Sequence, residues 1–189
     1  MGALLAACAS SAVAPSSRQM APYRDTIGLS GRLSVAYQKD GKGESLSGKF
    51  TWQQSGDRTD VTLASPLGQT IATIAITPTE ATLTQGNGRT RAAADIDTLS
   101  AQALGWPLPV SGLRDWLQGY AMAADGGRFI ASPQRTSVTT RDGWHLSYVS
   151  WQDDAATSLR PKRIDAERSA SPQADQVAIR IVIDEQTQP

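Results

Sequence analysis

The stretch DRTDVTLASPLGQTIATIAI, residues 57–76, indicates two β-strands joined by a tight turn. Val61 and Leu63 alternate with polar residues, and the segment 70–76 is apolar on both faces, as in a strand that is covered on both sides. Pro66 and Gly68 are typical of a turn, but the residue between them is Leu67. Such a leucine either packs back against a neighbour or faces water, and in the second case it needs a function.

The alternation with a period of two continues on both sides of this stretch. Leu33, Val35 and Tyr37 share one face of a predicted strand, and Phe50 and Trp52 share one face of the next. Further strand or hairpin-turn signals lie at residues 80–85, 86–89, 137–151, 161–168 and 176–184. These signals predict eight to eleven short strands in one antiparallel meander.

Residues 92–119 break this pattern and predict two short helices. Asp95 or Asp97 can cap the first helix, which ends before Gly105. Ser111 can cap the second helix, which ends at Gly119. The helices interrupt one domain, because no linker divides the region that follows residue 24.

The composition excludes several classes of protein. The chain has 189 residues, of which 40% are hydrophobic and 19% are charged. Lys plus Arg and Asp plus Glu each number 18, so the basic surplus of a nucleic-acid binder is missing. No apolar run approaches the roughly 20 residues that span a bilayer.

The sequence offers little catalytic chemistry. His145 is the one histidine, and it lies in a predicted strand opposite to Trp144 and Leu146. No nucleophile elbow, phosphate loop or metal-ligand spacing accompanies it. We therefore expect no enzyme, no metal and no cofactor; a hydrolase that uses His145 is the catalytic alternative.

Cys8 is the only cysteine, and it lies in an unusual place. The string Leu5-Ala6-Ala7-Cys8 resembles the lipobox of bacterial lipoproteins, in which the signal peptide is cut before a cysteine that is then acylated. We expect residues 1–7 to be the remnant of a signal peptide. Residues 8–24 would be the lipidated cysteine and its Ser/Ala/Pro tether, and residues 25–189 the folded domain.

Two segments resemble the LolB family. SPLGQTIATI (65–74) is followed by LGWPLPVSGLRDWLQG (104–119), and GRLSV (31–35) and GKFTWQQ (48–54) precede them in the family's order. The resemblance implies an incomplete, strongly curved antiparallel β-barrel, mainly β with about eleven strands, and an α-helical lid over a hydrophobic cavity.

The resemblance also implies a function. The family receives lipoproteins from the periplasmic carrier LolA and inserts them into the outer membrane without an energy source. This chain would then be a monomer, anchored by lipid to the outer membrane and facing the periplasm, with lipoprotein acyl chains in its cavity and no nucleic-acid partner.

The resemblance assigns candidate site residues as well. Pro66, Leu67 and Gly68 would form the protruding loop that meets the membrane, and Cys8 would carry the lipid. Apolar strand residues such as Ile181 could fill a closed core or line a groove, and periodicity does not separate the two. The candidate cavity and lid residues are Phe50, Trp52, Ile74, Leu99, Leu104, Trp106, Leu113, Trp116, Trp144 and Leu146.

Two further functions stay open at this point. A soluble LolA-like carrier of lipoproteins or lipids could use the same scaffold, but a diffusing carrier has no need of an acylated Cys8. A lipid-anchored envelope scaffold could instead have a closed core and no cavity.

Overall fold

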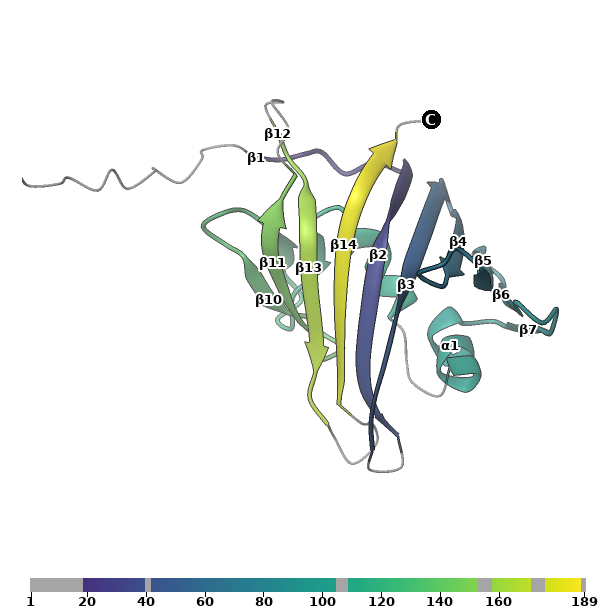
Figure 1. The fold of residues 1–189 in the computed structure, drawn as a ribbon. Coiled ribbons are helices and arrows are strands. Elements are labelled where there is room, and N and C mark those ends of the chain that lie inside the picture. Colours follow the sequence, from purple (N-terminus) through teal and green to yellow (C-terminus); the bar gives the residue numbers. More distant parts are fainter. Residues whose placement is uncertain (1–18, 40–41, 105–108, 153–157, 171–175, 188–189) are drawn as a thin grey trace, which may run out of the picture.

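The computed structural model describes residues 19–39, 42–104, 109–152, 158–170 and 176–187. These residues form one large antiparallel sheet, two small two-stranded sheets and two short helices (Figure 1). The large sheet has the spatial order β10-β11-β13-β14-β2-β3-β4-β5-β6-β7. Its strands are β2 (Thr26–Lys39), β3 (Lys42–Ser55), β4 (Arg58–Ala64), β5 (Thr70–Ile76), β6 (Ala81–Gln85), β7 (Thr90–Ala93), β10 (Ser137–Thr139), β11 (His145–Trp151), β13 (Pro161–Arg168) and β14 (Val177–Thr187).

The C-terminal strand joins the two halves of the sheet. β14 lies between β13 and β2, and its register places Ile181 opposite Leu33 and Ile179 opposite Val35. Figure 1 shows β4 to β7 turning away from the plane of β13, β14 and β2, so that the sheet curves without closing. The prediction of a mainly β, incomplete and strongly curved antiparallel barrel is therefore confirmed.

Alternation along the strands builds the core. Val35, Phe50, Trp52, Ile74 and Ile181 all lie on the inner face and are buried. Each fully buried side chain of this size contributes roughly 1.5–3 kcal/mol relative to exposure. The inner face therefore holds the helices against the sheet without a disulfide.

The first helix begins as the sequence predicts. α1 (Ile96–Leu104) lies beside β6 and β7, and the Asp95 carboxylate accepts hydrogen bonds from the backbone N–H groups of Asp97 (3.0 Å) and Thr98 (3.1 Å). Asp95 thus satisfies two of the backbone donors that every helix start leaves free.

The second helix begins differently from the prediction. α2 (Val110–Trp116) starts after Pro109, so Ser111 lies inside its first turn and does not cap it. Instead, the Ser111 backbone N–H donates to Asp97 (3.1 Å), and its hydroxyl donates to the same carboxylate. The Asp97 carboxylate of α1 therefore accepts hydrogen bonds from the first turn of α2, and these bonds join the two helices.

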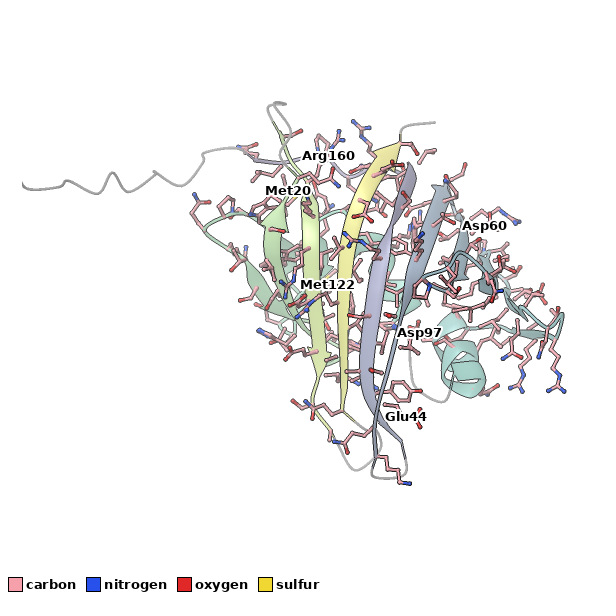
Figure 2. All side chains as sticks on the ribbon, in the orientation of Figure 1. Met20, Glu44, Asp60, Asp97, Met122 and Arg160 are labelled. Carbon is pink, nitrogen blue, oxygen red and sulfur yellow. The ribbon has the colours of Figure 1, made fainter. Side chains whose placement is uncertain are left out.

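Two small sheets were not predicted, because their strands have only two or three residues. β1 (Gln19–Met20) pairs in parallel with β12 (Ser158–Leu159), and β8 (Tyr120–Met122) forms a hairpin with β9 (Arg128–Ile130). Gly119 joins α2 to β8 with φ +87°, and a Cβ atom there would lie 2.5 Å from the Cε of Met20, which Figure 2 labels. Glycine is favoured at this position, because the positive φ would strain any other residue, whereas the flexible end of Met20 could move aside.

Candidate functional site

An apolar pocket lies between α2 and the inner face of the large sheet. The cavity itself measures about 30 Å³, far below the roughly 300–1,000 Å³ of ligand-binding pockets, so α2 nearly closes it in this structure. Strands β2, β3, β4, β5 and β14 form the floor, and α2 and the residue that follows it form the cover. All the lining residues are apolar: Leu33, Phe50, Trp52, Val61, Leu63, Ile74, Val110, Leu113, Leu117, Ile179 and Ile181. A pocket without polar partners suits an apolar ligand, because a buried polar group would lose its hydrogen bonds to water.

Four of the predicted cavity residues lie in this lining. Phe50, Trp52 and Ile74 come from three positions along β3 and β5, and Leu113 comes from α2. The first three are almost fully buried, so they form the floor of the pocket more than its mouth.

The other predicted cavity residues lie elsewhere. Leu99, Trp116, Trp144 and Leu146 are buried in the core but do not line the pocket. The rings of Trp116 and Trp144 pack against each other with centroids 6.0 Å apart, which joins α2 to the start of β11. The side chain of Leu104 and the whole of Trp106 lie outside the described residues.

Sequence reasoning missed several lining residues. Leu33, Val61, Leu63 and Ile179 lie on the inner face of their strands, and Val110 and Leu117 lie at the two ends of the cover. The sequence shows the alternation of the four strand residues. It does not show the strand order, which places β14 beside β2. Only this order brings residues from positions 33 and 179–181 to one pocket.

Polar contacts hold α2 over the pocket. The Arg114 guanidinium donates to the backbone carbonyl of Gly56 in the β3–β4 turn (2.5 Å) and to the hydroxyl of Tyr23 (3.2 Å). One turn later, the Gln118 side chain accepts from the backbone N–H of Arg24 (2.9 Å) and donates to its carbonyl (3.0 Å). The cover is thus joined to the segment before β2 by a few hydrogen bonds, and such bonds can exchange with water.

Tyr148 supports the end of α2 from beneath. Its hydroxyl donates to the backbone carbonyl of Trp116 (3.2 Å), and the Tyr120 carbonyl lies 3.5 Å away. Burial raises the pKa of the Tyr148 phenol far above its ordinary value, with a smaller contribution from the negative charge of Asp115. The phenol therefore stays protonated and remains a donor over the physiological pH range.

The turn between β4 and β5 is rigid and raises Leu67 above the sheet. The Gly68 N–H donates to the Ser65 carbonyl (2.9 Å), and the Ser65 N–H donates to the Gln69 carbonyl (2.8 Å). Pro66 presets the backbone dihedral of the second turn residue, and Gly68 adopts a φ of +90° that favours glycine.

Leu67 is exposed to 92%, so the interpretation of a leucine packed against a neighbour is wrong. The other exposed large apolar side chains of the described residues are all between 38% and 51% exposed: Leu46, Ile71, Met122, Ile130 and Val149. Leu67 therefore differs from the ordinary surface apolar residues of this chain, each of which packs in part.

The other chemical groups that the sequence analysis considered are placed as follows. Within the described residues, no group of histidine, cysteine, aspartate and glutamate could hold a metal ion. His145 is exposed on the outer face of β11, and its Nδ1 lies 3.4 Å from the hydroxyl of Thr139. Cys8 lies outside the described residues. No helix in the part of the chain that the structure describes has the length and apolarity to cross a membrane.

Comparisons with known proteins agree with this architecture. The family model described as "Outer membrane lipoprotein LolB" matches residues 25–185. Proteins named outer-membrane lipoprotein LolB from Cupriavidus taiwanensis and Cupriavidus necator are each 41% identical over 97% of this chain, and the matches cover 92% and 91% of those proteins. The protein of the same name from Thiobacillus denitrificans is 34% identical over 95% of this chain and 90% of its own length.

One solved structure shares the fold. A LolA superfamily protein from Nitrosomonas europaea superposes with a TM-score of 0.52, covering 90% of this chain and 88% of that chain. The two sequences are 8% identical, so this likeness concerns the fold alone.

Proposed function

Because the chain belongs to the LolB family of outer membrane lipoproteins, we propose that it is the receptor that accepts lipoproteins in the periplasm and inserts them into the outer membrane. The observation that carries this proposal is the apolar pocket beneath α2. The pocket offers acyl chains a surface without polar groups, and the rigid Leu67 turn offers a contact with the bilayer.

The energetics of acyl chains support a partly open pocket. Each methylene gains about 0.8 kcal/mol on leaving water, so a triacylated cargo needs a cover during its transfer. A cavity of about 30 Å³ has almost no room for an acyl chain while α2 is in place. We therefore infer that α2 moves outward when cargo enters, and that incomplete burial keeps the affinity low enough for release.

Leu67 would act at the delivery step. One leucine that enters lipid gains roughly 1.5–3 kcal/mol, which is too little to anchor a protein. It is enough to orient the turn, with Pro66 and Gly68, toward the bilayer during release of the cargo. The permanent anchor would be lipid on Cys8, with residues 1–7 as the signal remnant, residues 8–24 as the tether and residues 25–189 as the receptor domain.

The cargo would come from a LolA-like carrier and move downhill in affinity, from carrier to receptor to bilayer. The likeness in fold to a LolA superfamily protein supports a handover between two similar open barrels. We propose that the receptor acts as a monomer.

A two-stage transfer assay tests this function. A LolA-type carrier loaded with a triacylated lipoprotein is mixed with liposomes and the full chain carrying Cys8→Ser, which prevents acylation. Leu67→Glu is compared with Ile71→Glu, which places the same charge at an exposed apolar position of β5.

We expect cargo to reach the receptor in every variant. Cargo should enter liposomes at the wild-type rate with Ile71→Glu and at least tenfold more slowly with Leu67→Glu. Cargo that never leaves the carrier for the wild-type chain would contradict the receptor function, and the anchored scaffold with a closed core would then be the better interpretation.

A further inference from the structure

A second groove lies beside the Leu67 turn on the large sheet. It has a volume of about 270 Å³ and is lined by Arg32, Leu33, Ser34, Ser47, Gly48, Lys49, Pro66, Arg180 and Val182. Pro66 precedes Leu67 in the turn, so the groove borders the most exposed apolar side chain of the described residues. Three of the lining residues are cations and none is an acid.

Two of these cations oppose each other across neighbouring strands. The register of β2 and β3 places Arg32 directly opposite Lys49. Like charges in this position destabilise a sheet, so the pair opposes the stability of the fold. Arg32 also forms an ion pair with Asp184, so the unexplained member of the pair is Lys49, and a local rule that is broken in this way is a sign of function.

The acids near the groove neutralise only part of this charge. The Arg32 guanidinium donates hydrogen bonds to both carboxylate oxygens of Asp184, at 3.0 and 2.9 Å. Lys49 is exposed, and the described residues provide no ion pair for it.

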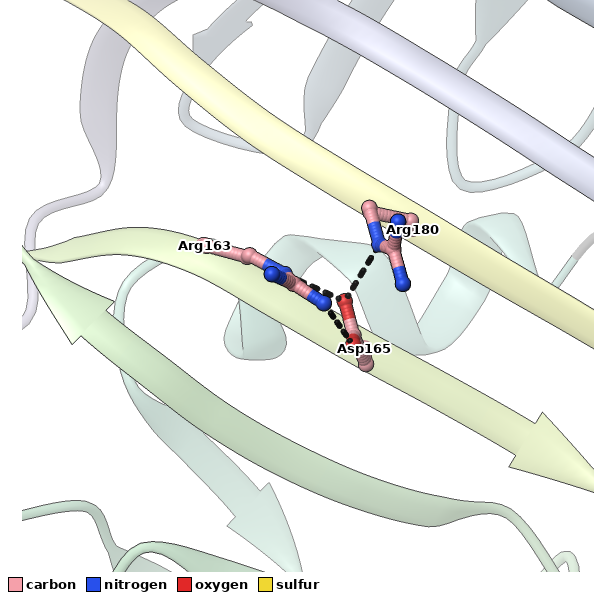
Figure 3. Close-up of polar contacts among 3 residues, drawn as sticks. All are labelled: Arg163, Asp165 and Arg180. Carbon is pink, nitrogen blue, oxygen red and sulfur yellow. Dashed lines mark hydrogen bonds and ion pairs between the residues drawn. The ribbon is translucent and has the colours of Figure 1, made fainter.

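Arg180 shares its acid with another arginine. Figure 3 shows Asp165 between Arg163 and Arg180. Arg163 binds both carboxylate oxygens, at 3.0 and 2.7 Å, whereas Arg180 reaches one of them at 3.3 Å. Because one carboxylate serves two guanidinium groups here, Arg180 keeps much of its positive charge available to the groove.

We propose that this groove binds the phosphate of a phospholipid headgroup while Leu67 is in the bilayer. The inference rests on the proposed membrane role of Leu67 and adds a ligand to it. Apolar side chains at a membrane surface enter about 5–10 Å below the headgroup boundary. A groove that begins at the neighbouring Pro66 then lies at the level of the phosphates.

The composition of the groove fits this level. Lys49 and Arg180 provide charge for the phosphate, and the hydroxyls of Ser34 and Ser47 provide neutral donors. Lysine and arginine place apolar stems against a surface and keep their charged ends in the polar layer. Leu67 would therefore fix the depth of the turn, and the cations would fix its orientation.

Vesicle binding by the full chain with Cys8→Ser tests the proposal. One vesicle type contains phosphatidylethanolamine and phosphatidylglycerol, and the other contains digalactosyldiacylglycerol, which has acyl chains but no phosphate. The variants are Lys49→Gln, Lys49→Arg, Leu67→Ser and the matched control Lys162→Gln. Lys162 is also exposed, but it does not line the groove.

On phospholipid vesicles at low ionic strength, we expect Lys49→Gln to bind about fivefold more weakly, and Lys49→Arg and Lys162→Gln to bind as the wild type does. On glycolipid vesicles, Lys49→Gln should bind as strongly as the wild type. Leu67→Ser should bind more weakly to both vesicle types, because both contain acyl chains. The two proposals can therefore be contradicted separately. Unchanged vesicle binding by Leu67→Ser would contradict the membrane role of the Leu67 turn. Unchanged binding to phospholipid vesicles by Lys49→Gln would contradict the phosphate site in the groove.

Two further results would overturn the phosphate site. The first is an equal loss of binding by Lys49→Gln on glycolipid vesicles. The second is unchanged vesicle binding with slower acceptance of cargo, which would make the groove a docking site for the carrier. A melting temperature for Lys49→Gln at or above that of the wild type is expected, since the substitution removes the repulsion from Arg32.

Discussion

Arg114 of α2 donates a hydrogen bond to the backbone carbonyl of Gly56, so the cover of the pocket is joined to the turn between β3 and β4. The same guanidinium reaches the hydroxyl of Tyr23, which also accepts from the Gln54 side chain at 3.4 Å. The cover is therefore held at its solvent side by one cation that contacts two separate segments. Movement of α2 away from the pocket must break these contacts.

Arg114→Met should loosen the cover and leave the sheet intact. The substitution keeps an apolar stem of similar length and removes hydrogen bonds that contribute about 1–3 kcal/mol. We expect faster amide hydrogen exchange in residues 110–117 and unchanged exchange in β13 and β14. Binding of an apolar dye should also become faster. Equal exchange of α2 in both proteins would show that Arg114 does not hold the cover.

Tyr148→Phe should reduce the loss of stability in alkali. The buried phenol has a pKa raised above its ordinary value of 10.0, chiefly by burial. Folding therefore favours the protonated form, and this contribution is present below pH 10 and is lost as the pH rises above 10. Urea unfolding between pH 9 and about 11.5 should show a smaller decline in the free energy of unfolding for Tyr148→Phe than for the wild type.

At neutral pH the same variant should be less stable by about 0.5–1.5 kcal/mol, because the Trp116 carbonyl loses the phenol as a donor and keeps the backbone N–H of Gly119 (3.0 Å). A Tyr148→Phe protein with the pH profile of the wild type would place the alkaline transition at another group.

Asp165→Asn should remove part of the acid sensitivity. Burial alone would raise the pKa of Asp165, but Arg163 and Arg180 outweigh burial and hold this pKa below its ordinary value of 3.8. The contribution to stability is therefore present above pH 3.8 and is lost as the pH falls through the lower pKa of the folded state.

The expected difference is small because both arginines are partly exposed. We expect Asp165→Asn to be less stable by up to about 1 kcal/mol at neutral pH, with a difference that shrinks toward zero as the pH falls below 3.8. Asp60→Asn is a matched control, since its partner Arg58 lies two residues before it on β4 and both side chains are about half exposed. A constant difference between Asp165→Asn and the wild type across this pH range would contradict the assignment.

Gly68→Ala should disturb the Leu67 turn without touching the pocket. Gly68 has a φ of +90°, which alanine adopts only with strain, although no heavy atom lies within 4 Å of an added Cβ. We expect a loss of roughly 1 kcal/mol in the free energy of unfolding, or a shift of the turn that relieves it. Delivery of cargo to liposomes should slow while acceptance from the carrier stays normal.

Gly88 provides the control for this turn. It has a similar φ of +83° and open space around it, but it lies in the β6–β7 turn. Gly88→Ala should lose comparable stability and deliver cargo at the wild-type rate. Equal delivery by Gly68→Ala and Gly88→Ala would mean that the geometry of the Leu67 turn is not important.

The sequence by itself determined the elements whose cause is local. Alternation predicted the strand that carries Phe50 and Trp52, and Asp95 was one of two predicted caps of α1, because side-chain period and capping act within a few residues. The apolar run 70–76 predicted a strand covered on both faces, which is wrong, because Ile71 and Thr73 lie on the exposed face of β5. The prediction of Ser111 as a cap failed because Ser111 donates its hydrogen bonds to Asp97, an acid of the other helix. The short strands β1, β8, β9 and β12 were missed, since two or three residues give no readable period.

Only the tertiary structure decided which residues share a site. The pairing of β14 with β2 joins positions nearly 150 residues apart, and it places Ile181 and Leu33 in one pocket and Arg32 near Arg180 in one groove. A net charge of zero concealed this cationic groove, because composition sums over the whole chain. The sequence left open whether Leu67 packs against a neighbour or faces water. Only the positions of all its neighbours decided this, since the exposure of a side chain depends on the packing around it.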